Sequence, residues 1–250
     1  MGNFKAGVGR VCITPPVGLI MAGYGERNQL SKGVHDDLYA KALVLDNGIT
    51  KLSIVATDLL GLDKELVAKI RQIVEKRTGI KKDKIMIAAS HTHSGPEITK
   101  EFKLLGIPME EKPIEGLSKN EFIDHLRDTV ARWVAGAVYI ANNNLGEAKI
   151  GVDKGEVHTV GLNRRDPKGP MDPEVGVIRI DNMDGNPMAI LMNFTCHPTV
   201  LSSKNYLFSA DYPGCAMKTV ETVLGGGVIA MFTNGACGDI STRFVRREQT

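Results

Sequence analysis

An apolar segment at residues 84–89 restricts the fold of this 250-residue chain more than any other feature. It follows an amphipathic segment, residues 63–78, and an earlier apolar segment, residues 52–57. The amphipathic segment is predicted to be a helix, because Asp63 can cap its start and Gly79 follows its end. A strand, a helix and a strand in this order favour a right-handed crossover, which places the two strands parallel in one sheet.

Two predicted hairpins indicate that the sheet is not wholly parallel. Residues 38–45 and 52–57 flank an Asp-Asn-Gly turn, which is a strong hairpin signal. Residues 175–180 and 188–195 form a second such pair. We therefore predict one α/β domain over residues 1–250, with a mixed β-sheet core made of two hairpins and the strand–helix–strand unit, flanked by helices.

Other segments complete this prediction. The Gly-rich residues 18–33 are predicted to be a loop, whose glycines either serve tight turns around a locally packed Tyr24 or let the loop line a pocket. Residues 97–116 are predicted to be a lid or insertion loop. Further strands are predicted at residues 5–13, 148–161 and 228–232, a turn at residues 161–166, and helices from Ser118 to about Asn142 and from residues 209–214 to residues 225–227. No core element is expected after the loop that contains Ser241.

The composition excludes several classes of function. A net charge of +2 gives no electrostatic case for binding nucleic acid or an anionic membrane. No apolar span approaches about 20 residues, so no transmembrane helix is expected. Because no signal peptide is seen, we expect a cytoplasmic protein whose four cysteines are reduced thiols.

Two histidines follow the apolar segment at residues 84–89. His91 and His93 are two positions apart, and at the end of a strand such residues point to the same face. Their Cα atoms would then lie about 7 Å apart, so both imidazoles could reach one metal ion. The alternative is that one or both are hydrogen-bonded residues at the rim of the sheet.

A third histidine stands in a similar place. His197 ends the apolar strand at residues 188–195 and precedes Pro198. Together with His91 and His93 it would make a tri-histidine zinc site with a fourth position open for water. A hydrogen-bonded rim histidine is again the alternative.

Two further segments carry candidate residues. The strand at residues 228–232 runs into a Gly-rich loop that ends at Ser241, and such loops gather backbone amides around an anion or a developing oxyanion. Gly-Asp and Ile-Ser also occur in ordinary turns and helix caps. Arg164 and Arg165 lie in a turn, where arginines are usually solvated, although one could grip a carbonyl or carboxylate oxygen.

Several motifs together resemble one family. In order along the chain they are G-V-G-R-x-x-I-T-P-P, M-x-G-Y-G, G-V-H-D-D-L-Y-A-K-A, S-H-T-H-S-G-P, L-N-R, N-F-T-C-H-P and G-D-I-S. They look like the N-terminal catalytic domain of the neutral/alkaline non-lysosomal ceramidases and their bacterial relatives. The resemblance runs from about Lys5 to Ser241.

This resemblance implies an amide-bond hydrolase that contains zinc. By position, His91 and His197 match the family's two histidine ligands, and His93 matches a histidine beside the metal. Arg164 matches an active-site arginine, and Ser241 matches the serine proposed as the nucleophile. The family completes its zinc sphere with a glutamate and a tyrosine far downstream, which leaves three readings: a truncated product, a differently built site or a lost metal.

A further departure from the family concerns the residues after Ser241. The family's serine usually precedes Pro-Asn, whereas Thr242 and Arg243 follow Ser241 here.

We expect a zinc-dependent hydrolase of a carboxamide, with N-acylsphingosine or another N-acyl compound as the small-molecule or lipid amide substrate. The alternatives are a metal-dependent hydrolase of a soluble amide or ester, and an inactive partial domain that acts through a partner; a homo-oligomer is left open. A weaker alternative is a two-metal phosphoester hydrolase that uses Asp36, Asp37 and Asp58.

Overall fold

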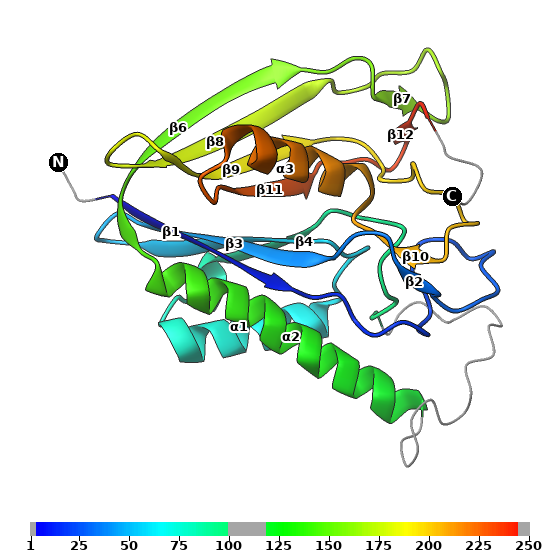
Figure 1. The fold of residues 1–250 in the computed structure, drawn as a ribbon, viewed down its shortest axis with the longest axis horizontal. Coiled ribbons are helices and arrows are strands. Elements are labelled where there is room, and N and C mark those ends of the chain that lie inside the picture. The colour runs from blue at the N-terminus through cyan, green and yellow to red at the C-terminus, as the bar shows by residue number, and fades with distance from the viewer. Residues whose placement is uncertain (1–3, 100–118, 245–250) are drawn as a thin grey trace.

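A computed structural model describes residues 4–99 and 119–244. Its main feature is an eight-stranded sheet, whose strands are β1 (Lys5–Cys12), β3 (Tyr39–Asp46), β4 (Lys51–Thr57), β5 (Ile85–Ala89), β6 (Gly146–Glu156), β8 (Glu174–Asn182), β9 (Pro187–Phe194) and β11 (Ile229–Asn234). They lie in the order β11-β9-β8-β6-β1-β3-β4-β5 (Figure 1). The predicted α/β class and mixed sheet are confirmed.

The pairing of the strands confirms both hairpins and the crossover. β3 and β4 are antiparallel, as are β8 and β9. β4 and β5 are parallel and are connected by helix α1 (Lys64–Thr78). α1 begins where predicted, because the Asp63 side chain accepts a hydrogen bond from the Leu66 amide, and it ends at Gly79, whose φ is 76°.

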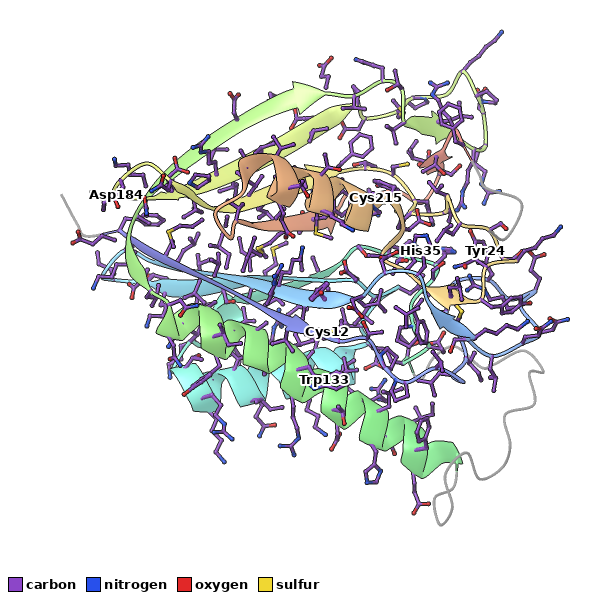
Figure 2. The ribbon with its side chains drawn as sticks, viewed as in Figure 1. Cys12, Tyr24, His35, Trp133, Asp184 and Cys215 are labelled. Carbon is purple, nitrogen blue, oxygen red and sulfur yellow. The ribbon has the colours of Figure 1, made fainter. Side chains whose placement is uncertain are left out.

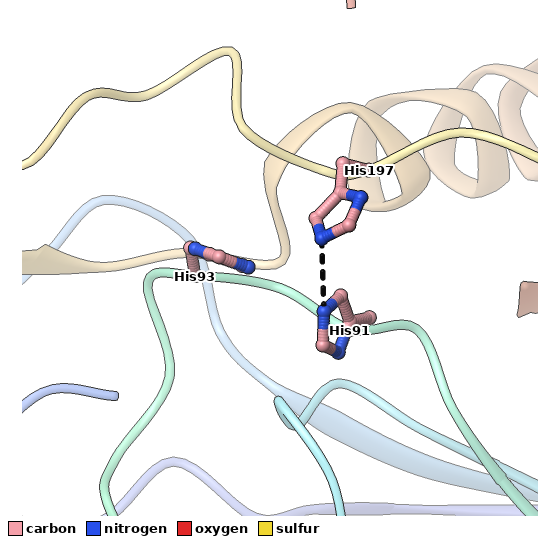
Figure 3. A group of neighbouring side chains, drawn as sticks. All are labelled: His91, His93 and His197. Atoms are coloured by element: carbon pink, nitrogen blue, oxygen red, sulfur yellow. Dashed lines mark hydrogen bonds between the residues drawn. The ribbon is translucent and has the colours of Figure 1, made fainter. Parts of the chain in front are cut away.

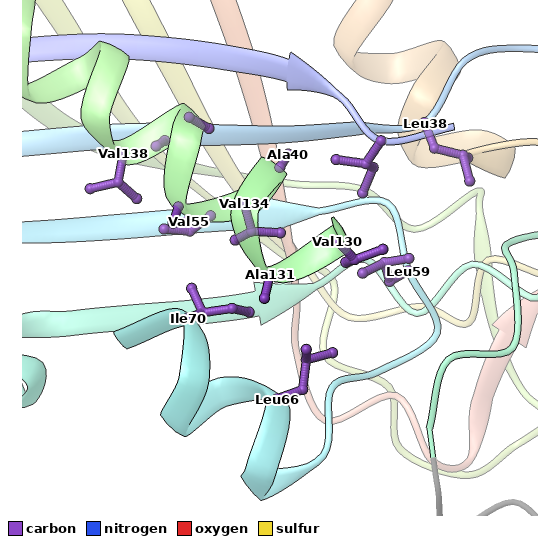
Figure 4. Close-up of a cluster of buried hydrophobic side chains, with 14 of the residues drawn as sticks. Leu38, Ala40, Val55, Leu59, Leu66, Ile70, Val130, Ala131, Val134 and Val138 are labelled. Carbon is purple, nitrogen blue, oxygen red and sulfur yellow. The ribbon is translucent and has the colours of Figure 1, made fainter. Parts of the chain in front are cut away.

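Two helices cover one face of the sheet. α1 packs on α2 (Lys119–Asn143), and α2 lies along β1 and β3 (Figure 1). Buried aliphatic side chains from both helices and the strands fill the space between them (Figure 4). Trp133 on α2 packs against this core from its edge (Figure 2). Because these apolar faces have the 3.6-residue period of a helix, the sequence predicts this layer well.

The sheet also folds over on itself. Its two edge strands, β5 and β11, contact each other although they stand at opposite ends of the strand order. A second core lies between the two halves and includes Leu43 of β3, Ile180 of β8 and Met231 of β11. Beyond the strand ends, the Asn234 side chain donates hydrogen bonds to the carbonyls of Ser90 and Cys196, at 2.9 and 3.0 Å. This closure brings the chain after β5 beside the chain after β9.

Short elements border the same end of the sheet. β2 (Gly33–Val34) pairs with β10 (Leu207–Phe208), and α3 (Asp211–Leu224) packs against β11. β7 (Gly161–Asn163) pairs antiparallel with β12 (Ile240–Thr242).

Some predictions are wrong, and others reach outside the described residues. The predicted strand at residues 148–161 ends at Glu156, and residues 161–163 of the predicted turn form β7. Ser241 lies within β12 rather than in a terminal loop, because β12 gains its backbone hydrogen bonds from β7. The expected lid lies outside the described residues from residue 100 onward, as does Ser118.

No helix in the described part of the chain is long and apolar enough to span a membrane.

Candidate metal centre

His91 is held in an unusual backbone conformation. β5 ends at Ala89, and His91 has a φ of 71°, in the left-handed region that few residues other than glycine adopt. Its amide donates a hydrogen bond of 3.0 Å to the Leu59 carbonyl. The expectation that His91 and His93 project from one extended strand is therefore wrong. A turn brings their rings together instead, with centroids 5.1 Å apart.

Backbone carbonyls fix the tautomers of two histidines. His91 Nδ1 lies 2.8 Å from the Leu60 carbonyl oxygen. His197 Nδ1 lies 2.5 Å from the Cys237 carbonyl oxygen and 3.1 Å from that of Ile240. Because a carbonyl oxygen only accepts, both Nδ1 atoms must carry the proton. Each neutral ring therefore presents a free lone pair on Nε2.

These two lone pairs face each other. His91 Nε2 and His197 Nε2 are 3.2 Å apart (Figure 3). Neither atom has a proton to donate, so this contact is not a hydrogen bond between neutral rings, and a cation shared by both atoms would relieve their repulsion. Two nitrogens bound to a tetrahedral zinc lie roughly 3.3 Å apart. The two side chains therefore fit a metal ion, and their Nδ1 hydrogen bonds are of the kind that orient histidine ligands.

His93 completes the group. His91, His93 and His197 each offer one ligand atom, and these three atoms lie within 4.8 Å of one another. Among the described residues, this is the one group of three or more potential ligands that could hold a metal ion. The His93 ring extends toward the other two (Figure 3). Neither of its ring nitrogens has a hydrogen-bond partner. Burial, followed by the charges of His91 and His197, lowers the pKa of His93 to about 3, so its imidazole is neutral at pH 7.

The Gly-rich loop at residues 18–33 supports His93. Gly23 has a φ of 95°, and a Cβ atom there would lie 2.5 Å from His93 Cγ, so only glycine leaves space for the ring. The Tyr24 ring packs edge-on against His93 at 4.9 Å. Arg27 donates hydrogen bonds of 2.7 Å to the carbonyls of Ala22 and His93. These contacts fix the position of the His93 ring, and the lining of a pocket by this loop stays a prediction.

Ser241 and Arg164 reach the same region from β12 and β7. The His197 amide donates a 3.0 Å hydrogen bond to the Ile240 carbonyl, and His197 and Ser241 form a parallel bridge. The Arg164 side chain is exposed and donates through Nη2 to the Gly238 carbonyl at 2.6 Å. Its positive charge contributes to the lowered pKa values of His93 and His197.

Other candidate residues lie elsewhere. Asp36, Asp37 and Asp58 do not join the histidine group, so the described residues give no support to a two-metal site. The cysteines are free thiols, as expected. Burial raises the pKa of Cys196 to about 12, which keeps this thiol protonated and unreactive.

Two residues that organise the centre were not predicted. Arg27 is a lone arginine in a loop, which ordinarily indicates a solvated side chain, and Asn234 ends β11 without belonging to a recognisable motif. Their roles depend on partners that are distant in the sequence. The preceding Gly-Tyr-Gly segment was the available signal for Arg27, since it marks a loop with close backbone contacts.

Comparisons with known proteins point to one family. Residues 4–247 match the family described as neutral/alkaline non-lysosomal ceramidase, N-terminal. The chain is 27% identical to neutral ceramidase A of Dictyostelium discoideum over 96% of its own length and 36% of that protein. It is 24% identical to the neutral ceramidase of Pseudomonas aeruginosa, over 95% of its length and 37% of that protein. The chain thus spans about a third of these relatives.

Solved structures agree on the fold. The crystal structure of neutral ceramidase from Pseudomonas aeruginosa superposes with a TM-score of 0.83 at 21% identity, covering 100% of this chain and 41% of that one. A ceramidase complexed with C2 gives a TM-score of 0.81 at 22% identity, covering 96% of this chain and 39% of that one.

Proposed function

The chain belongs to the neutral/alkaline non-lysosomal ceramidase family, and from this premise we propose that it is a zinc-dependent hydrolase of a carboxamide bond. One observation carries the proposal. His91 Nε2 and His197 Nε2, both unprotonated, face each other at 3.2 Å in a partly buried site. Two imidazole lone pairs at this spacing suit a divalent transition metal, and zinc is the metal that imidazole most commonly binds in hydrolases.

We assign the metal to His91 and His197, with direct ligation by His93 as the alternative. When bound, zinc would polarise a substrate carbonyl and lower the pKa of a water molecule. His93 is neutral at pH 7 and has no partner for either ring nitrogen, so it can accept a hydrogen bond from the attacking hydroxyl and orient it. Because the pKa of His93 is so low, its part is to orient the nucleophile more than to store a proton.

Arg164 and Ser241 would act on the substrate itself. Arg164 anchors one Nη2–H on the Gly238 carbonyl, which leaves other N–H groups of its fork to hold the substrate carbonyl or a nearby oxygen. Ser241 is adjacent to the backbone of His197, and its side chain makes no hydrogen bond within the described residues. It would either attack the carbonyl carbon or donate its O–H to the developing oxyanion.

The substrate class follows from the family and from the named relatives. Proteins that match nearly the whole chain are named neutral ceramidases, and one similar structure is of a ceramidase complexed with C2. We propose an N-acyl compound as the substrate, either N-acylsphingosine or another N-acyl amine. The chain spans about a third of those relatives, and a soluble amide or ester is the competing substrate.

The experiment is a hydrolysis assay that detects both products. Zinc-supplemented protein is incubated with N-acylsphingosine and, separately, with a soluble N-acyl amine, and the released amine and carboxylate are quantified by mass spectrometry. His197→Ala should abolish release, and Ser241→Ala and Arg164→Ala should each reduce it by at least about 100-fold. His125→Ala is the matched control, because His125 is exposed on α2 and should leave the rate unchanged.

Two results would contradict the proposal. One is wild-type protein that binds zinc but releases neither product from either substrate. The other is His197→Ala protein that retains the wild-type rate. Release from the soluble amide alone would keep the hydrolase proposal and reject N-acylsphingosine as the substrate.

A further inference from the structure

A second pocket lies on the other side of the segment Ser209–Ala210 from the metal centre. It has a volume of about 440 Å³, which is within the range of small-molecule sites. Asp36 forms part of its wall and accepts a hydrogen bond of 2.5 Å from Ser209 Oγ. From the metal-centre side, Thr92 donates a 2.7 Å hydrogen bond to the Ser209 carbonyl. None of the three histidines of the metal centre lines this pocket, so it is a separate site.

Asp58 is the unusual group in this pocket. Its side chain is 96% buried, since only 4% of the residue is exposed. Oδ2 accepts a 2.8 Å hydrogen bond from the Tyr39 amide. Oδ1 makes no hydrogen bond to a described residue and is not fully buried, so it is accessible from the pocket that Asp58 lines. Burial raises the pKa of Asp58 to about 7 although the charge of Lys41 opposes this, so at pH 8 the pocket contains a carboxylate with one accessible oxygen.

The cations that line the pocket are already engaged. Lys41 is buried, and its Nζ donates to Glu221 Oε1 at 2.9 Å and to the Ala230 carbonyl at 2.8 Å. Arg10 Nη1 lies 3.6 Å from the other oxygen of Glu221. Within the described part of the chain neither cation, nor the exposed Lys218 at the rim, forms an ion pair with Asp58. The chain thus supplies no direct cationic partner for this carboxylate.

A ligand could supply that partner, and its chemistry is restricted. The aspartates of this pocket are not among the described residues grouped closely enough to hold a metal ion. A primary ammonium group carries one positive charge and three N–H donors, and it is compact enough to reach the accessible oxygen of a mostly buried carboxylate. Tyr39 and Met217 line the same pocket and offer contact to an attached alkyl chain. We propose that this pocket binds a primary alkylammonium compound through Asp58 Oδ1.

The test uses n-butylammonium as the probe. The full chain is titrated with n-butylammonium chloride at pH 8, at constant ionic strength set with KCl, and binding is followed by calorimetry and by the rise in melting temperature. Tetramethylammonium is the control ligand, because it has the same charge and the same number of non-hydrogen atoms but no N–H donor. We expect saturable binding of n-butylammonium and at least about tenfold weaker binding of tetramethylammonium, since tetramethylammonium cannot donate a hydrogen bond to the carboxylate.

Two variants localise the binding. Asp58→Asn keeps an acceptor for the Tyr39 amide but removes the charge, and it should weaken n-butylammonium binding by at least about tenfold. Asp184→Asn removes an exposed carboxylate at the turn between β8 and β9, far from His35 at the pocket rim, and should bind like the wild type (Figure 2). The melting temperature of Asp58→Asn without ligand shows that it is folded.

The proposal is overturned if wild-type protein shows no saturable binding of n-butylammonium, or if Asp58→Asn binds it with wild-type affinity. Equal affinity for tetramethylammonium would also overturn it, because the N–H donors would then contribute nothing. All of these measurements are made without zinc, so they do not depend on the proposed hydrolysis.

Discussion

Two buried arginines show how the helix-covered part of the molecule differs from the strand ends around the metal centre. Arg127, on α2, forms an ion pair with Asp63 at 2.6 Å, and both side chains are 6% exposed. The hydrogen bond to Asp63 raises the pKa of Arg127. Arg27, at the strand ends, is 2% exposed and forms no ion pair with a described residue. Its contacts include three backbone carbonyls, and burial lowers its pKa to about 10.

The difference extends beyond these two residues. The helix-covered layer consists of aliphatic side chains and a capped helix. The strand ends contain a histidine at positive φ, a buried histidine whose ring nitrogens lack partners, and a buried aspartate whose pKa is raised to about 7. Such groups are costly in the absence of a ligand, and they are the groups with which a ligand can interact. The first region therefore provides stability, and the second provides chemistry.

The largest change in stability is expected when the two arginines are replaced by methionine, one in each of two variants. Arg127→Met breaks a buried ion pair and should lower the free energy of unfolding by about 3–5 kcal/mol, while the folded fraction keeps its zinc and its activity. Arg27→Met should lower the free energy of unfolding less, yet reduce activity per folded molecule, because Arg27 holds the His93 carbonyl. Urea unfolding measures the stability of both variants, and zinc content and the amide hydrolysis assay measure their function per folded molecule. A larger stability loss in Arg27→Met would reverse the comparison.

Asp58→Asn should have the next largest effect, and it should stabilise the protein. The pKa of Asp58 is raised to about 7, above its ordinary value of 3.8, so between these values the native state holds the proton more tightly than the unfolded chain. Stability therefore falls as pH rises from about 4 to 7 and stays at the lower level above 7. Replacement by Asn should remove this loss, which is roughly 4 kcal/mol.

The measurement is the difference between variant and wild type across the pH range. Burial also raises the pKa values of Asp211 and Glu97, which gives the wild type a background slope of the same sign. Subtracting the two urea-unfolding curves at each pH isolates Asp58. Equal slopes in both proteins between pH 4 and 7 would show that the pKa of Asp58 is not raised.

The sequence was sufficient for the local parts of the fold. The β3–β4 hairpin and helix α1 follow from turn residues, caps and periodic apolar positions, all within a few residues of one another. The contact between edge strands β5 and β11, and the pairing of β7 with β12, depend on residues far apart in the chain, and no local pattern encodes them.

The candidate site also has features that the sequence predicts and features that only the folded structure shows. His91, His93 and His197 were recognisable because histidines near strand ends are chemically distinctive and their motifs resemble a family's. Their actual geometry was not predictable, because the turn that places His91 at a φ of 71° is held by the Leu59 carbonyl. The support from Arg27 also required the folded structure.

Two glycine substitutions with smaller effects on stability separate backbone strain from the contact between Gly23 and the His93 ring. Gly23→Ala and Gly48→Ala both place a side chain at positive φ, of 95° and 82°, and each should cost about 1 kcal/mol of stability. The Cβ atom at position 23 would also collide with the His93 ring, whereas nothing lies within 4 Å of a Cβ at position 48. We expect only Gly23→Ala to lose activity in the amide assay. Equal activities would show that the position of the His93 ring does not matter.

The smallest expected change in stability comes from His91→Gly. Glycine adopts the observed φ of 71° without strain, so the metal-free variant should be more stable than metal-free wild type by roughly 1 kcal/mol. It should at the same time lose zinc affinity, because the lone pair that faces His197 is removed. Thermal unfolding with and without zinc distinguishes the two effects. A variant that is less stable without metal would indicate that His91 contributes to stability in the metal-free protein.

Metal content per chain tests the central claim most directly. Protein purified without affinity metals or chelators is supplied with zinc, passed through a desalting column and analysed for bound elements. Our account predicts close to one zinc per chain in the wild type and in His125→Ala, and none in His197→Ala. Wild-type protein that retains no zinc, or His197→Ala protein that retains a full complement, would contradict it.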